Sequence, residues 1–90
     1  ADVVLCREML FHLSYSDVDR VLSNVRRSSA KYLIATTNRS IRFNSDIPSG
    51  AFREINLERR PFALPPPIQT IRDDSVAAGR VLAVWDLGAS

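Results

Sequence analysis

Cysteine and long apolar runs are scarce in this sequence, and each shortage excludes a class of protein. Cys6 is the single cysteine in 90 residues, so an internal disulfide and a zinc site built from several cysteines are excluded. No apolar run approaches the roughly 18 residues that a membrane-spanning helix needs, and no signal-peptide pattern is visible. We therefore expect a protein of the reducing cytoplasm, with no membrane span and no bound metal.

Dense clusters of basic residues are also missing. The chain carries twelve basic and ten acidic residues, for a formal net charge of +2. The arginines are scattered, and only Arg26–Arg27 and Arg59–Arg60 are adjacent. Surfaces that bind nucleic acid usually show a denser basic face, so the sequence does not favour a nucleic-acid partner.

Apolar residues, in contrast, are plentiful enough for a folded core. They make up 46% of the chain, which is typical of a globular protein and too high for a disordered segment. A chain of this length supplies one domain at most. We therefore expect one small α/β domain.

The first part of the chain, residues 2–37, predicts a parallel β-α-β unit. Residues 3–6 and 31–37 are runs of apolar, β-branched and aromatic residues, which are typical of strands buried on both faces. Between them, a serine at position 14 or 16 can cap a helix. Apolar residues then recur on one helical face at Val18, Val21, Leu22 and Val25. Two strands joined through a helix lie parallel, with a right-handed crossover.

The remaining residues predict a long irregular loop and an antiparallel strand pair. Residues 38–67 contain turn-forming residues at 44–50 and four prolines towards their end, which prevent a continuous helix. Such a segment is either functional or a surface loop anchored by Phe52 and Phe62. Within residues 68–90, the stretches 68–72 and 80–87 predict strands. Because no helix joins them, they should pair antiparallel, with the last strand inside the sheet.

The predicted elements leave the sheet short of a second layer. Parallel strands covered on both faces need helices on both sides, yet the sequence supplies one clear helix. We therefore expect residues 1–90 to form a single partial domain, whose second layer comes from a missing N-terminal half or from a second copy. A bare edge on the first strand would serve such pairing.

Several stretches of the sequence resemble a group of bacterial class I methyltransferases, enzymes that use S-adenosylmethionine on a Rossmann-like sheet. Residues 5–14, which read LCREMLFHLS, are similar to the LCRD-x-L-x-HLS stretch of that group. Residues 32–37 resemble its next strand, and Asn56-Leu57, Pro61-Phe62 and the proline run resemble its long substrate-side loop. The resemblance implies the C-terminal half of the methyltransferase sheet. Its fourth and fifth strands are parallel, and its seventh lies antiparallel between the fifth and the sixth.

The resemblance also implies roles for individual residues. Cys6 and Arg7 would line the cofactor site, while His12 and Glu8, which replaces the aspartate of the group, would be catalytic groups facing the substrate. A base at His12 suits methyl transfer to oxygen or nitrogen, although a histidine among apolar residues is also often a hydrogen-bonded structural group. In the substrate-side loop, selection of the substrate would fall to Asn38, Arg53 and Asn56.

A shortage of glycine limits the activity that the resemblance implies. In the family, a glycine-rich turn holds the methionine end of S-adenosylmethionine. This chain has only Gly50, Gly79 and Gly88, none of them in a G-x-G pattern. We therefore predict the C-terminal portion of an S-adenosylmethionine-dependent methyltransferase that binds no cofactor by itself. The alternative is a non-enzymatic module that self-associates through its exposed strand edge.

Overall fold

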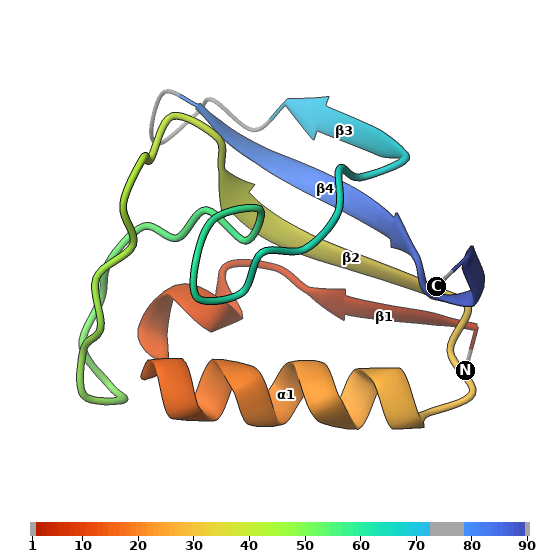
Figure 1. Cartoon of the computed structure of the whole chain (residues 1–90), viewed down its shortest axis with the longest axis horizontal. Coiled ribbons are helices and arrows are strands. Elements are labelled where there is room, and N and C mark those ends of the chain that lie inside the picture. The colour runs from red at the N-terminus through yellow and green to blue at the C-terminus, as the bar shows by residue number, and fades with distance from the viewer. Residues whose placement is uncertain (1, 73–78, 90) are drawn as a thin grey trace.

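A four-stranded mixed sheet with one α-helix against it forms the framework of the computed structural model (Figure 1). The structure describes residues 2–72 and 79–89. Its elements, in chain order, are β1 (Val3–Cys6), the 3-10 helix η1 (Met9–His12), α1 (Tyr15–Arg27), β2 (Tyr32–Asn38), β3 (Gln69–Arg72), β4 (Arg80–Asp86) and the 3-10 helix η2 (Leu87–Ala89). The predicted α/β class, helix and strands are confirmed, with small differences in their bounds.

The strands lie in the order β1-β2-β4-β3. β1 and β2 are parallel, with Val3 opposite Tyr32 and Cys6 opposite Ala35, as expected for two strands joined through a helix. β4 runs antiparallel to both of its neighbours, and β3 forms the far edge. The predicted parallel pair, the antiparallel pair and the interior position of the last strand are confirmed.

The helix α1 forms because a cap, favourable charges and an apolar stripe coincide. The Ser14 side chain accepts a hydrogen bond from the backbone N–H of Asp17 at 3.2 Å, which satisfies one of the free donors at the helix start. Arg26 and Arg27 occupy the last turn, where positive charge stabilises the helix dipole. The stripe that α1 buries consists of Val18, Leu22 and Val25.

One face of the sheet carries the hydrophobic core. Because side chains alternate along a strand, Leu33 and Ala35 of β2 share a face with Ala83 and Trp85 of β4, and all four are buried. α1 covers this face beside β1 and β2. The segment 39–68, which has no helix or strand, as predicted, gives the core Ile55, Leu57 and Phe62.

Of the two predicted anchors of the irregular segment, only Phe62 is buried. Its ring meets Tyr15 of α1 edge to face, with 5.3 Å between centroids, so the segment packs against the helix. Phe52 is 52% exposed and contacts the buried Phe11 and the exposed His12. The segment is therefore held to the core mainly by buried residues, among them Phe62, and Phe52 adds an aromatic contact from a partly exposed position.

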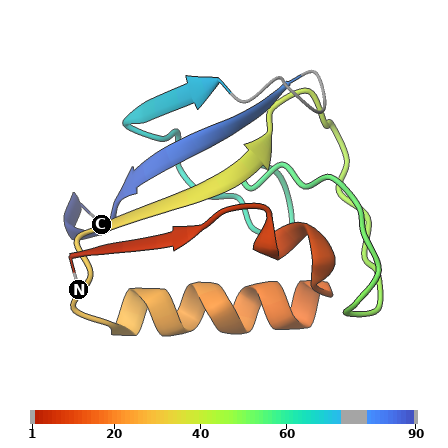
Figure 2. The same ribbon diagram turned by 180° about the vertical axis from the view of Figure 1, so that it is seen from behind.

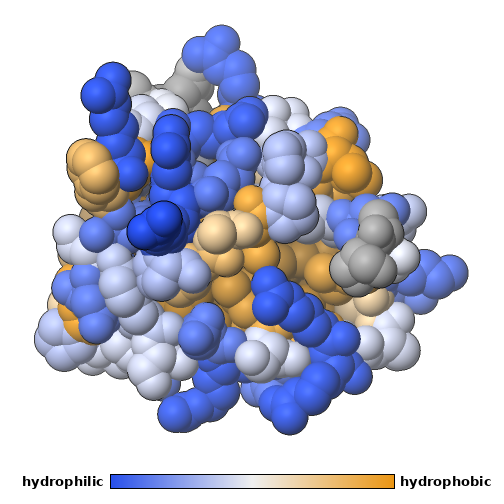
Figure 3. All heavy atoms as spheres, viewed as in Figure 1, coloured by the Kyte–Doolittle hydropathy of each residue, from blue (hydrophilic) through white to orange (hydrophobic). Residues whose placement is uncertain are grey.

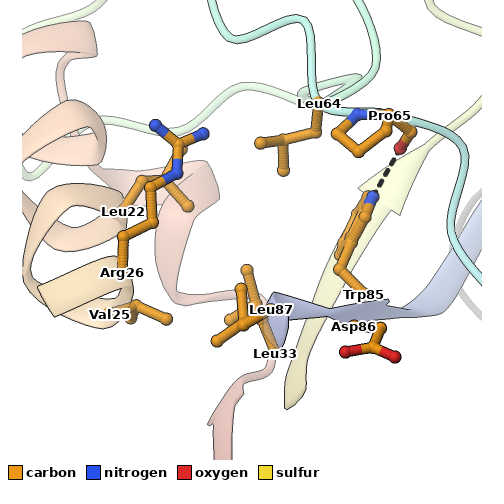
Figure 4. Close-up of a pocket in the computed structure, with 9 residues that line it drawn as sticks. All are labelled: Leu22, Val25, Arg26, Leu33, Leu64, Pro65, Trp85, Asp86 and Leu87. Atoms are coloured by element: carbon orange, nitrogen blue, oxygen red, sulfur yellow. Dashed lines mark hydrogen bonds between the residues drawn. The ribbon is translucent and has the colours of Figure 1, made fainter. Parts of the chain in front are cut away.

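A hollow remains on the core-bearing face, near the end of β4. One helix is roughly 10 Å wide and covers about two strands that lie ~4.8 Å apart, so α1 does not reach β4. The cavity has a volume of about 400 Å³, and its apolar wall is visible in Figures 3 and 4. Trp85 closes one side and donates from Nε1 to the Pro65 carbonyl at 2.6 Å. The other lining residues are Leu22, Val25, Arg26, Leu33, Leu64, Asp86 and Leu87.

The opposite face of the sheet is apolar and faces the viewer in Figure 2, where no helix or strand of residues 2–72 and 79–89 covers it. Leu5 is 62% exposed on this face and Ile71 is 49% exposed. The other apolar residues of the face are Val3, Tyr32, Ile34, Leu82 and Val84. β1 was predicted to be covered on both faces, with the second layer supplied by a missing half or by a second copy. Within the described residues α1 lies on one face only, and cover on the other face stays a prediction.

No helix in the described part of the chain is long and apolar enough to cross a membrane. α1, the longest, has 13 residues. The Cα radius of gyration is 12.2 Å, which is typical of a compact domain of about this size.

Candidate functional site

Four polar side chains meet where β1 and β2 end, and we call Glu8, Asn38, Glu54 and Arg80 the ion cluster. Arg80 is only 2% exposed. Its Nη1 lies 3.2 Å from Glu8 Oε1, and its Nε donates to Glu54 Oε1 at 3.2 Å while its Nη2 contacts Glu54 Oε2. Asn38 Nδ2 also donates to Glu54 Oε1, at 2.9 Å. The Arg80 guanidinium further packs over the Phe11 ring, so a buried cation is matched by two carboxylates and an aromatic face.

The fold assembles the ion cluster from distant parts of the chain. Asn38, the last residue of β2, pairs with Arg80, the first residue of β4. Glu8 follows β1, and Glu54 comes from the segment 39–68. Because β1 and β2 are parallel, their carboxyl ends meet at one edge of the sheet. That edge is where open α/β sheets bind ligands.

Glu8, a predicted catalytic residue, is fixed through both its backbone and its carboxylate. Its φ of 58° lies in the left-handed region, which is uncommon for a residue with a side chain. Its backbone N–H donates to Thr36 Oγ1 at 2.8 Å, which stabilises this turn. The side chain is 44% exposed. Its carboxylate can therefore meet a ligand from solvent while Arg80 still holds it.

Glu54 is the ionised partner at the inner end of the ion cluster. Burial raises the pKa of its carboxyl, but hydrogen bonds from Arg80 and Asn38 and the charge of Arg80 outweigh burial. The pKa of Glu54 therefore lies below its ordinary value of 4.5. Glu54 stays charged at neutral pH, so Arg80 keeps a permanent counter-ion that no ligand has to supply.

His12, the predicted base, lies exposed on η1. Its Nδ1 is 3.2 Å from the carbonyl oxygen of Ala51, and its ring packs on Phe52 with 5.3 Å between centroids. A carbonyl oxygen only accepts hydrogen bonds, so in this contact Nδ1 carries the proton and, in the neutral ring, Nε2 is unprotonated. The ring is thus held in the tautomer that accepts a proton at Nε2.

The two residues predicted to line the cofactor differ in exposure. Cys6 is 3% exposed, and burial raises the pKa of its thiol. It is therefore an unreactive thiol, and only its backbone can meet a ligand. Arg7 is exposed on the turn that leads from β1 to Glu8.

The residues predicted to select substrate fall into two groups. Asn38 belongs to the ion cluster. Arg53 donates from Nε and Nη1 to three backbone carbonyls at distances of 2.7 to 3.2 Å, and the buried Asn56 donates to the carbonyl of Ile41 at 3.0 Å. These bonds hold the segment 39–68 in place, and a substrate contact by Arg53 or Asn56 stays a prediction.

Glu54 and Arg80 are central to the site, yet the sequence analysis did not single them out. Arg80 opens a strand that is otherwise almost wholly apolar, and a charge in such a strand requires a buried partner. That signal could have identified Arg80. Glu54 lies 26 residues away in the sequence, on a segment without periodicity, so no local pattern indicated it.

Among residues 2–72 and 79–89, no three His, Cys, Asp or Glu side chains converge as metal binding requires. Both carboxylates of the ion cluster face Arg80, which opposes binding of a cation between them. Any function rests on this geometry, because comparisons of the chain with protein families, curated proteins and solved structures found no match.

Proposed function

We propose that the chain is the C-terminal portion of an S-adenosylmethionine-dependent class I methyltransferase. The observation that carries this proposal is the strand order β1-β2-β4-β3, with β4 antiparallel between its neighbours. Resemblance to the family implies this order for the fourth, fifth, seventh and sixth strands. Mixed α/β sheets commonly carry their antiparallel strand at an edge. An antiparallel strand inside the sheet is therefore a more specific likeness.

The bare face of the sheet supports the same proposal. Parallel strands such as β1 and β2 are normally covered on both faces, whereas Leu5 on the bare face is 62% exposed. In a complete methyltransferase, the N-terminal half would cover this face and lie beside β1. That half, or a second copy of the chain, is the partner that we propose for this face.

The site at the carboxyl ends of β1 and β2 suits methyl transfer to oxygen or nitrogen. S-adenosylmethionine, when bound to the complete enzyme, supplies the methyl group. The acceptor atom loses a proton as it bonds to the methyl carbon, and His12 would take that proton at Nε2. Glu8, held by Arg80, would orient the acceptor by a hydrogen bond, since alignment supplies much of the rate in such reactions.

Cofactor binding needs residues beyond those of this chain. Gly50, Gly79 and Gly88 form no G-x-G pattern. Gly79 has a φ of +84°, and a Cβ there would lie 2.6 Å from Asn38 Oδ1 and from Ser40 Oγ. The lack of a Cβ at Gly79 therefore lets Asn38 of the ion cluster pack closely against the backbone. Cys6 and Arg7 would form only one edge of a cofactor site. We therefore expect no cofactor on residues 1–90 alone.

Calorimetry with S-adenosylhomocysteine tests the proposal. We expect no saturable binding to residues 1–90, and micromolar binding to the longest polypeptide that the gene encodes around them. In that polypeptide, Glu8→Gln should lower methyl transfer with little change in the affinity for S-adenosylhomocysteine. Arg27→Gln, on the exposed side of α1, is the matched control and should change neither quantity.

Two results would contradict the proposal in different ways. Tight binding to residues 1–90 would show that the glycine-rich turn is dispensable. Absence of binding to the longer polypeptide would exclude a methyltransferase altogether.

A non-enzymatic module that self-associates is the second candidate. Among residues 2–72 and 79–89, β1 is an edge strand that pairs only with β2, and an open edge offers unpaired backbone groups to another strand. Leu5 adds exposed apolar surface beside this edge. A second copy could thus extend the sheet through β1.

Light scattering during size-exclusion chromatography tests the second candidate. For the module, residues 1–90 should elute as a dimer, and Leu5→Lys should convert it to a monomer. Ile68→Lys is the control, because Ile68 is equally exposed at 62% but precedes the opposite edge strand. A monomer at high concentration would exclude the second candidate.

A further inference from the structure

Three arginines from two separate stretches line one shallow groove on the segment 39–68. Arg42 comes from one stretch, and Arg59 and Arg60 come from the other. Phe43 and Asn44 complete the lining, and the groove has a volume of about 430 Å³. We call these five residues the arginine groove.

The two stretches are locked together by the side chain of Asn44. Its Nδ2 donates to the backbone carbonyls of Asn56 and Arg60 at 2.9 and 2.8 Å. Its Oδ1 accepts from the backbone N–H of Asn56 at 2.8 Å. Both ends of one amide are thus used to hold the arginine-bearing backbones side by side. The groove is therefore preorganised, which reduces the entropy lost when a ligand binds.

The charge of the arginine groove is not balanced within the described chain. Among residues 2–72 and 79–89, no acidic side chain forms an ion pair with Arg42, Arg59 or Arg60. The acid nearest in sequence, Glu58, pairs instead with Arg39 at 3.0 Å. Three like charges held along one groove repel each other, and an anion relieves that repulsion.

Phe43 adds an apolar ring to this basic surface. Phe43 is 87% exposed, more than any other large hydrophobic residue in the described part of the chain. A ring in this position makes no contribution to the core and costs solubility. The ring is accessible to a flat, apolar group that approaches from solvent.

We propose that the arginine groove binds single-stranded nucleic acid. Arginine forks bind phosphate oxygens in a bidentate manner, and an exposed aromatic ring stacks on an unpaired base. A groove that offers both groups together matches a ligand with alternating phosphates and bases. The site stands on its own residues, so binding is expected whether or not the chain takes part in methyl transfer.

Fluorescence anisotropy with labelled oligonucleotides tests this proposal. The probes are a mixed-sequence single-stranded RNA, the DNA of the same sequence, the corresponding duplex, inorganic polyphosphate and polyglutamate. We expect both single strands to bind more tightly than the duplex, since only unpaired bases can stack on Phe43. The slope of log affinity against log salt should be about −2, from roughly 0.7 for each of three phosphates.

Matched variants separate the groove from general charge. Arg42→Gln with Arg60→Gln should weaken binding about tenfold and reduce the salt slope to about −0.7, because one arginine remains. Arg26→Gln with Arg27→Gln removes the same charge from α1 and should leave binding unchanged. Phe43→Ala should weaken binding about tenfold without changing the salt slope, and Phe43→Tyr should restore it. All of these positions are exposed, and circular dichroism would verify that each variant folds.

Each contrary outcome identifies what is wrong. If the double variant on α1 lost as much affinity for the oligonucleotides as the double variant in the groove, net charge alone would explain the binding. If duplex bound as tightly as the single strands, the groove would be an anion site without base recognition. The same would follow if polyphosphate bound as tightly and Phe43→Ala had no effect. Binding of polyglutamate as tight as that of RNA would assign the groove to an acidic protein. Any of these results overturns the proposal.

Discussion

Arg80 shows how a small sheet accommodates a charge at the start of an apolar strand. The guanidinium is 2% exposed and would be strongly destabilising without its partners. Glu54 neutralises it from inside, and Glu8 shares it with solvent. One permanent and one accessible counter-ion make the ion cluster a structural brace whose outer carboxylate, that of Glu8, faces solvent. Removal of either carboxylate therefore has a structural cost.

The lowered pKa of Glu54 predicts how stability depends on pH. The folded state keeps Glu54 ionised below 4.5, its ordinary pKa, whereas the unfolded state takes up the proton first as the pH falls. Protonation thus favours unfolding, so this contribution is complete above about pH 4.5 and is lost below it. Urea unfolding, measured between pH 7 and pH 3, should show that the free energy of unfolding declines as the pH falls. The decline should be smaller in Glu54→Gln than in the unchanged chain. An unchanged decline in that variant would place the acid sensitivity elsewhere.

At the scale of single elements, α1 is determined largely by its own sequence. Ser14 caps it, Asp17 lies in its first turn and the arginines lie in its last, so each end complements the helix dipole. The apolar stripe orients it on the sheet. β1 and β2, in contrast, form only because neighbouring strands supply their hydrogen-bond partners. β1 pairs with β2, and β2 also pairs with β4.

The cap of α1 yields a prediction with an internal control. Ser14→Ala should lower the free energy of unfolding by about 1 kcal/mol, because the backbone N–H of Asp17 loses its acceptor. Ser16, the other serine that the sequence offered as a cap, lies exposed within the helix. Ser16→Ala should change stability by less than about 0.5 kcal/mol. Urea denaturation measures both, and equal losses would contradict the assignment of the cap.

For the molecule as a whole, one hydrophobic core stabilises the described chain, and only one of the two faces of the sheet contributes to it. A domain of this size buries only about 60–65% of its unfolded surface. The bare face and the cavity beside Trp85 reduce burial further. We infer that the chain gains stability from any partner that covers the bare face, by mass action.

Cys6 offers a measurement of that global stability. It is buried in the core, and burial raises the pKa of its thiol. A disulfide reagent should therefore react with folded chain only through unfolding, and the reaction should accelerate in urea in proportion to the unfolded fraction. Fast reaction in the absence of denaturant would mean that the core opens locally around β1.

The local features of this protein follow from its amino-acid sequence alone. The apolar spacing from Val18 to Val25 predicted α1, the short helical link predicted a parallel strand pair, and the prolines predicted a segment without helices. Each follows from interactions between residues close in the chain. The interior position of the last strand was also predicted, because its sequence is nearly all apolar, whereas exposed edge strands usually carry charged residues.

The places where charged side chains meet, in contrast, depend on how the chain folds in three dimensions. Glu8, Glu54 and Arg80 form one cluster although Glu8 and Arg80 lie 72 residues apart. Arg42 and Arg60, read from the sequence as scattered charges, line one groove because Asn44 joins their backbones. Charges on irregular segments have no period that reveals their direction. Their neighbours depend on long-range hydrogen bonds and packing, which a linear sequence pattern does not encode.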